Sequence, residues 1–448
     1  MNDGTDVRTT FIRAATWHGS LDRAQAVLAA HPEVASSDIH TAAILGDAPA
    51  VRRFLESDPA SVRATSGPYG AEPLVHLCLS KYLRLDPSRS AGFLETAKAL
   101  LDAGADPNGG FWSAGQYPEF ETALYGAAGV AHHADLTRLL LERGAYPDEE
   151  VAYHTAEGYD NAAMILLVES GRLSDESLTT LLIRKHDWHD YEGVKWLLEH
   201  ALDPNRISHW GFPALHHALR RDNDLPIIAL LLDHGADPGA SWEGHTAIAL
   251  AARRGRSDVL DLLEQRGVPL DLHGVDRLIA ACARNHSAHI RTILEGEPGL
   301  RVEVLAMGGE LLARFAGTGN LPGVGQLLDL GVEAGARYVE GDGYFGIAKD
   351  STALHVAAWR AYPGIVRLLI GRGTPVDVPD GKGRTALALA VKACVDSYWT
   401  ERRSPESVQA LLDAGASVEG VAYPSGYPAV DQLLLSHGAQ PSGGDTNG

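Results

Sequence analysis

The chain has 448 residues, of which 45% are hydrophobic and 21% charged, proportions typical of a folded protein and not of a disordered one. Its 38 Lys and Arg residues against 58 Asp and Glu residues give a formal net charge of −20, which opposes non-specific attraction to nucleic acid or to an anionic membrane. We therefore expect no nucleic acid and no membrane among its partners.

Targeting and redox signals point to the cytoplasm. The N-terminal residues lack the basic and apolar regions of a secretory signal, and no apolar run reaches the ~20 residues of a membrane helix. The three cysteines, Cys78, Cys282 and Cys394, are odd in number and far apart, which argues against a disulfide framework. We expect a cytoplasmic protein in which Cys78 and Cys282 pack in the core.

A pattern of two short amphipathic helices recurs from the N-terminus onward. The first two units, residues 11–32 and 38–59, have helical periodicity but no Thr-Ala-Leu opening. Further units are expected at residues 72–108, 122–147, 151–173, 174–205, 211–238, 244–270 and 274–300.

The eighth unit shows the pattern most clearly. Ile248, Ala251 and Ala252 fall on one side of a first helix, and residues 258–266 place their apolar side chains on one side of a second. Gly267 can supply the left-handed conformation that ends the second helix. The same stop is expected at Gly104, Gly144, Gly235, Gly373, Gly415 and Gly438.

The C-terminal third is less regular. Residues 301–337 are rich in glycine, and each Gly inside a helix costs ~1 kcal/mol relative to Ala. Residues 351–377 and 384–418 are strong units, followed by a half unit at 428–440. We therefore predict an N-terminal array (residues 1–300), a degenerate repeat with a long loop and a possible kink (301–350), C-terminal repeats with a cap (351–440) and a disordered tail (441–448).

Four openings carry a family resemblance: Thr122-Ala123-Leu124, Pro213-Ala214-Leu215-His216, Thr352-Ala353-Leu354-His355 and Thr385-Ala386-Leu387. With the Leu-Leu pairs and glycines that follow at a period of ~33 residues, the chain resembles the ankyrin repeat family. The resemblance implies an all-α fold, a helical repeat solenoid of about twelve ankyrin-type helix-turn-helix units with finger loops. It also implies that the opening histidines hydrogen-bond within and between repeats.

The resemblance also places the partner-contacting residues, just before each opening and just after the Ala-Ala pair. These positions are rich in Trp and Arg, the residue types most common in binding hot spots. The candidate partner-binding residues are His209, Trp210, Phe212, Arg220, Arg221, Trp242, Glu243, His245, Arg253, Arg254, Trp359 and Arg360.

Two alternatives remain open for these positions. The arginines are either binding residues or helix-end residues that pair with Asp222, Asp224 or Asp258. Similarly, the aromatic residues of the long loops at 107–121 and 334–350 either contact a partner or fold back over the adjacent repeat.

The function expected from this pattern is that of a non-enzymatic protein-protein interaction scaffold or adaptor. It would bind another protein, or an acidic or aromatic-bearing segment, along its concave face, as a monomer with no cofactor, metal or catalytic residue. Neither a Gly-x-Ser-x-Gly elbow nor a phosphate loop occurs in the chain. The alternative is a small-ligand or metal-dependent enzyme with a site among the long loops, near Trp112 and His132-His133.

Overall fold

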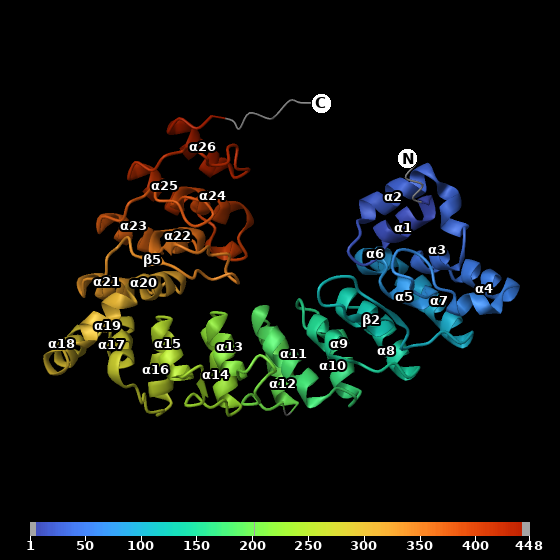
Figure 1. Cartoon of the computed structure of the whole chain (residues 1–448), viewed down its shortest axis with the longest axis horizontal. Helices are drawn as coiled ribbons and strands as arrows, with labels where there is room; N and C mark the ends of the chain where they lie inside the picture. The colour runs from blue at the N-terminus through green and yellow to red at the C-terminus, as the bar shows by residue number, and fades with distance from the viewer. Residues whose placement is uncertain (1–5, 201, 441–448) are drawn as a thin grey trace. The chain divides into compact units, whose positions relative to one another are not determined.

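The computed structural model describes residues 6–200 and 202–440, and in these ranges the chain forms successive pairs of antiparallel helices (Figure 1). The predicted all-α repeat solenoid is confirmed. The predicted disordered tail, residues 441–448, lies outside the described residues. The described helices include none with the length and apolar character needed to cross a bilayer.

Contacts divide the chain into two compact units whose boundary falls in one helix pair, α13 and α14. Unit 1 contains residues 1–218 and 233–236, and unit 2 contains residues 219–232 and 237–448. Residues 301–350, where we expected a possible kink, lie wholly inside unit 2.

Unit 1 stacks helix pairs in chain order. Its helices are α1 (Val7–Ala15), α2 (Leu21–Ala30), α3 (Ile39–Ile44), α4 (Ala48–Ser57), α5 (Pro73–Cys78), α6 (Lys81–Leu85), α7 (Ser90–Asp102), the π-helix η4 (Tyr125–Val130), α8 (Ala134–Glu142), α9 (Glu149–Thr155), α10 (Ala162–Glu169), α11 (Asp175–Asp187) and α12 (Tyr191–Glu199). Short 3₁₀ turns follow α2, α4 and α6 as η1 (Pro32–Ser36), η2 (Pro59–Arg63) and η3 (Pro87–Arg89). The strands β1 (Gly110–Trp112) and β2 (Phe120–Thr122) form an antiparallel hairpin before η4.

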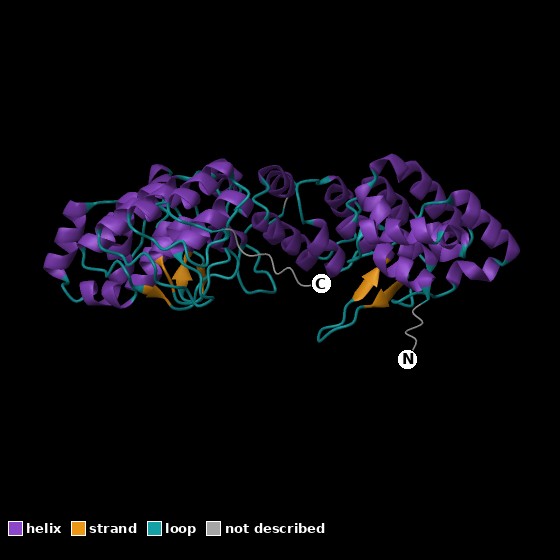
Figure 2. Ribbon diagram, turned by 90° about the horizontal axis from the view of Figure 1, so that it is seen from above, coloured by secondary structure: helices purple, strands orange, loops and turns teal. Residues whose placement is uncertain are grey.

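Unit 2 continues the same plan. The boundary pair is α13 (Ala214–Arg220) and α14 (Leu225–Asp233), and the helices that follow are α15 (Ala247–Arg253), α16 (Ser257–Gln265), α17 (Gly274–Ala283), α18 (Ser287–Gly296), α19 (Leu300–Ala306), α20 (Gly308–Gly317), α21 (Leu321–Asp329), α22 (Ala353–Trp359), α23 (Pro363–Gly371), α24 (Ala386–Asp396), η5 (Thr400–Arg402), α25 (Glu406–Asp413) and α26 (Pro428–Ser436). Two hairpins, β3 (Ser241–Trp242) with β4 (His245–Thr246) and β5 (Arg337–Tyr338) with β6 (Ser351–Thr352), precede α15 and α22 (Figure 2).

Local sequence explains where the helices start and stop. The Asp47 carboxylate accepts the Ala50 N–H at 2.9 Å to start α4, and Asp190 accepts the Gly193 N–H at 3.0 Å to start α12, which satisfies backbone donors that lack a helical partner. The glycines predicted to end second helices all have positive φ, namely Gly104, Gly144, Gly235, Gly267, Gly373, Gly415 and Gly438. These predicted stops are confirmed.

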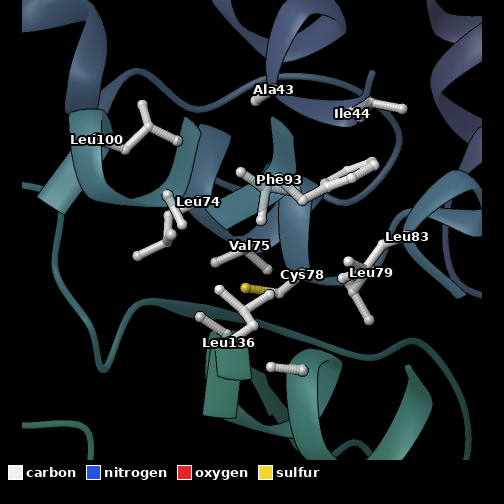
Figure 3. Packing of buried hydrophobic residues seen from close by; sticks show 14 of the residues in the cluster. Ala43, Ile44, Leu74, Val75, Cys78, Leu79, Leu83, Phe93, Leu100 and Leu136 are labelled. Atoms are coloured by element: carbon white, nitrogen blue, oxygen red, sulfur yellow. The ribbon is translucent and has the colours of Figure 1, made fainter. Parts of the chain in front are cut away.

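The core of each unit lies between its stacked helices. In unit 1, the Cys78 side chain packs among Val75, Leu79 and Leu136 (Figure 3). All three cysteines are buried and free, which agrees with the packing role predicted for Cys78 and Cys282. Burial also raises the pKa of the Cys282 thiol to about 12, so that this side chain stays protonated.

The glycines of residues 301–337 allow close packing inside unit 2. They do not prevent helix formation, because α19, α20 and α21 all form in this stretch. A Cβ on Gly309 would lie 2.1 Å from the Arg337 carbonyl oxygen, and one on Gly308 would lie 2.8 Å from Val332. Glycine therefore lets α20 approach the segment that leads into β5.

Candidate partner-binding surface

The candidate residues of unit 2 gather around one carboxylate, that of Asp222. Asp222 follows α13 with a φ of 51°, Arg254 follows α15, and Arg360 follows α22. The Arg254 guanidinium donates to Asp222 Oδ1 through Nε at 3.0 Å and Nη2 at 2.7 Å. Arg360 Nη2 donates to Asp222 Oδ2 at 3.3 Å. Arg254 and Arg360, which lie 32 and 138 residues from Asp222 in the sequence, thus share its carboxylate.

The repeats that carry these loops are held together by further side-chain bonds to the backbone. Thr318 Oγ1, after α20, donates to the Arg254 carbonyl at 2.9 Å. The Asn320 amide donates to the carbonyls of Gly255 at 2.7 Å and Ala283 at 2.8 Å. The ends of α15, α17 and α20 therefore converge, although α17 and α20 belong to different helix pairs. This convergence brings Arg360 of the next repeat to Asp222.

Aromatic rings cover the guanidinium groups around Asp222. The guanidinium carbon of Arg220 lies 4.7 Å from the centre of the Trp242 ring, and that of Arg221 lies 3.9 Å from the centre of the Tyr344 ring. The guanidinium carbon of Arg360 lies 4.2 Å from the centre of the Phe345 ring and 4.6 Å from the centre of the Trp399 ring. Such stacking stabilises a partly desolvated cation. We name the group formed by Arg220, Arg221, Asp222, Trp242, Arg254, Tyr344, Phe345, Arg360 and Trp399 the arginine cluster.

Burial and neighbouring charges shift the pKa values within the arginine cluster. Burial lowers the pKa of Arg220, the nearby Arg221 and Arg254 lower it further, and Glu243 and Asp342 partly oppose these effects. Burial opposes the charge of Asp222, but Arg254 and Arg360 outweigh burial and hold the pKa of this carboxyl below its usual value. The pKa of Arg254 is raised by Asp222 against the effect of burial, whereas burial keeps the pKa of Arg360 below its usual value. The shared carboxylate therefore compensates Arg254 better than Arg360, in line with the shorter bonds to Arg254.

Four of the predicted partner-binding residues are buried and need correcting. Arg254 is 7% exposed and Arg360 5%, because both guanidinium groups are used internally by Asp222. Trp359 is buried because its Nε1 donates to the Phe345 carbonyl at 2.6 Å. Phe212 is buried against the His217 ring at 4.9 Å. These side chains shape the surface and do not themselves offer it to a partner.

The remaining candidates of unit 2 are at least partly accessible. Arg220, Arg221, Trp242 and His245 are half-buried, and Glu243 is exposed in the turn of the β3–β4 hairpin. Arg253 is also half-buried, and its Nε donates to Asp276 at 2.6 Å. The pairing alternative therefore describes the contacts of both Arg253 and Arg254: Arg254 pairs with Asp222, which that alternative named, and Arg253 pairs with Asp276, which it did not name.

In unit 1 the exposed candidates are His209 and Trp210. The Trp210 side chain is 36% exposed and lies against Phe212 and Tyr153. His209 Nδ1 lies 3.0 Å from the Glu149 carboxylate and 3.6 Å from that of Glu176. These three groups offer ligand atoms within 4.8 Å of one another, an arrangement that an ion pair between exposed groups also produces.

Two histidines singled out in the sequence, His133 and His355, have structural contacts. His133 caps α8 by accepting the Leu136 N–H at 3.1 Å, and its Nε2 lies 2.6 Å from the Ser90 hydroxyl. His355 bonds Thr352 within its repeat and the Arg384 carbonyl of the next repeat at 3.2 Å. The role that the family resemblance implies for His355 is thereby confirmed.

Sequence reasoning missed how the long-loop aromatics are divided. Phe345 and Trp399 are buried against Arg360, so they fold back over their own unit. Tyr344, by contrast, is 40% exposed beside Arg221, and Trp112 of β1 is 68% exposed. No local signal separates Tyr344 from Phe345, because the two are adjacent in sequence and only the packing of unit 2 distinguishes their sides.

Comparison with known proteins identifies the repeats. A family model described as ankyrin repeats (3 copies) matches residues 186–273 and 215–305, and one for a single ankyrin repeat matches residues 349–381. A segment of 84 residues is 36% identical to serine/threonine-protein kinase 12 of Arabidopsis thaliana. That match covers 19% of this chain and 16% of the kinase, and a match of this extent carries no argument for kinase activity. Ankyrin repeats are in general protein-protein interaction modules.

Proposed function

Since the chain is an ankyrin repeat protein, we propose that it is a non-enzymatic scaffold that binds an acidic, aromatic-bearing segment of another protein. The surface proposed for this contact is the accessible part of the arginine cluster, Arg220, Arg221, Trp242 and Tyr344, together with Glu243 and His245 of the adjacent hairpin.

The observation that carries the proposal is the gathering of four arginines and their stacked aromatic rings around one buried carboxylate. Arg254 and Arg360 share the carboxylate of Asp222, and Arg221 and Arg254 lower the pKa of Arg220. A chain of net charge −20 concentrates positive charge here at a cost in repulsion and desolvation. Incoming carboxylates would relieve the repulsion, and they would also be steered toward a basic patch on an acidic molecule.

The accessible aromatic residues favour a protein segment over a simple anion. Trp242 and Tyr344 stack on arginines and leave part of each ring accessible. Trp, Tyr and Arg are the residues that most often dominate the energy of protein interfaces. Trp210 in unit 1 is a second exposed aromatic anchor for the same class of partner.

The test selects random twelve-residue peptides for binding to the full chain and repeats the selection with the Arg221→Glu variant. We expect the wild type to enrich peptides that combine Asp or Glu with an aromatic residue, and the variant to lose this enrichment. Arg291→Glu, which makes the same charge change at an exposed position on α18, is the matched control and should retain it.

The affinity of the strongest selected peptide for the wild type and for a Trp242 variant then measures how much the Trp242 ring contributes to binding. Trp242→Ala should weaken its binding by about 2 kcal/mol, the value typical of a hot-spot tryptophan. Circular dichroism checks that each variant is folded. Enrichment without acidic residues, or an equal loss in the Arg291 control, would count against this surface.

A further inference from the structure

Unit 1 contains a pocket of about 410 Å³ that the proposed function does not use. Its volume lies within the range of small-molecule sites, ~300–1,000 Å³. The walls come from the loop after α1, from α6 and η4, from the residues around the end of α9 and from the end of α11. The pocket is independent of the arginine cluster, since every lining residue lies in unit 1.

Aromatic side chains form two walls of this pocket. On one side Trp17 Nε1 donates to the Tyr125 hydroxyl at 3.0 Å, which ties the first repeat to the fourth. On the other side Tyr159 meets Trp188 edge to face at 6.4 Å between ring centroids. Tyr159 is 69% exposed, so most of its ring remains available for stacking.

The backbone of the pocket departs from the repeat pattern. The first helix of this repeat is the π-helix η4, which contributes Tyr125, Gly129 and Val130 to the lining. A Cβ on Gly129 would lie 2.8 Å from the His154 Cβ, so only glycine allows this turn to approach α9. Single π turns inside helical proteins occur frequently at functional sites.

His132 adds an unsatisfied polar atom at the same place. Its φ of 50° is the regular conformation of this turn, since Trp17, His189 and Asp222 also have positive φ two residues after the first helix of their repeats. Its Nδ1 atom, however, is buried and has no hydrogen-bond partner among the described residues. A buried polar atom without a partner is costly, and a bound ligand would supply one.

Two basic side chains of the pocket are placed to hold an anion. Lys81 and Arg84 of α6 line it, and within the described residues no ion pair or side-chain hydrogen bond engages either one. Burial and the neighbouring Arg84 both lower the pKa of Lys81.

His154, another residue of the lining, is already paired with two carboxylates. Burial opposes its protonation, but hydrogen bonds to Glu150 and Glu157 outweigh burial and raise its pKa to about 9. The two acidic residues of the lining are already engaged. Glu157 binds His154 and accepts from Arg184 at 2.8 Å, and Asp160 accepts the Ala162 N–H at 3.0 Å.

From these contacts we infer that the pocket binds a small aromatic molecule that carries an anionic group, a phosphate or a carboxylate. Lys81 and Arg84 hold the anion, and the aromatic ring stacks against Tyr159 and Trp188. The pocket volume fits one aromatic ring with its anionic substituent. The basic pair Lys81 and Arg84 and the aromatic pair Tyr159 and Trp188 come from different elements of the lining.

The test measures binding of phenyl phosphate to the full chain by isothermal titration calorimetry, with inorganic phosphate and phenol as the two halves of the probe. We expect phenyl phosphate to bind at least tenfold more tightly than either half. The double variant Lys81→Gln/Arg84→Gln should lose at least tenfold for phenyl phosphate and leave phenol binding unchanged. Tyr159→Ala should weaken both phenyl phosphate and phenol.

The matched control is Arg53→Gln/Arg138→Gln, which removes two exposed positive charges of the same unit that do not line the pocket. It should bind phenyl phosphate as the wild type does, and the urea unfolding midpoint of each variant confirms folding. Phenyl phosphate that binds no more tightly than inorganic phosphate, or an equal loss in the control, would overturn the inference. Since the probe does not involve the arginine cluster, Arg221→Glu should leave its affinity unchanged.

Discussion

At the scale of single residues, Asp222 decides what the arginines of unit 2 do. Arg254 and Arg360 are buried, and each contacts the same carboxylate. The sequence pointed to Asp222 as a possible partner for Arg254 because arginines at helix ends commonly pair with nearby aspartates. It held no signal for Arg360, which is 138 residues from Asp222 and reaches it only through the convergence of the repeats.

Asp222→Asn should therefore destabilise the protein strongly. The substitution keeps the shape of the side chain but leaves two buried guanidinium groups without a negative partner, and breaking a buried pair in this way costs about 3 kcal/mol or more. Urea unfolding measures the loss. Asp224→Asn, two residues away and exposed, should change stability by less than about 0.5 kcal/mol. Equal stabilities of the two variants would show that the shared carboxylate contributes little.

At the scale of secondary-structure elements, irregular sequence has two different meanings. Glycines in residues 301–337 suggested a weak repeat, yet α20 is a regular helix whose glycines admit close neighbours. Gly126 and Gly129 belong to the π-helix η4, where Gly126 packs against Cys78 of α5 and Gly129 against α9. Composition alone does not distinguish these cases, because the cost of a helical glycine depends on which atom would meet its missing side chain.

Gly309→Ala should test the packing interpretation of α20. The added Cβ would meet the Arg337 carbonyl oxygen at 2.1 Å, a clash with backbone that a rotamer change cannot relieve, so we expect a loss of roughly 1 to 3 kcal/mol.

The matched control is Gly325→Ala in α21, where nothing lies within 4 Å of the new Cβ. It should be neutral or stabilise by up to about 1 kcal/mol, because alanine favours the helix and restricts the unfolded chain. Chemical denaturation of both variants provides the measurement. Stabilisation by both substitutions would contradict the close approach at Gly309.

At the scale of the whole molecule, stability is expected to vary along each unit. A repeat protein is stabilised by contacts between neighbours, so that a repeat with a neighbour on each side is held more firmly than a terminal one. In unit 2, α22 packs on both α20 and α24, whereas α26 follows α25 at the end of the described chain.

Hydrogen exchange followed by mass spectrometry should reveal this gradient. We expect the amides of α26 to exchange fastest within unit 2 and those of α22 slowest, because local opening of a terminal repeat breaks only one interface. In unit 1 the helices α1 and α2 should exchange faster than α9 for the same reason. Uniform protection from α15 to α26 would instead indicate that unit 2 opens as one cooperative body.

The sequence by itself determined the repeat. Spacing of apolar residues, Thr-Ala-Leu openings and glycine stops are local signals, because each specifies one helix or its end, and they predicted the helix pairs and their stops from Gly104 to Gly438. Tertiary structure alone decided which candidates face outward. Arg360 meets Asp222, Tyr344 is exposed while Phe345 is buried, and Lys81 and Trp188 line one pocket, because residues of distant repeats come together in the fold. Such contacts depend on how successive helix pairs stack, and no single repeat encodes that stacking.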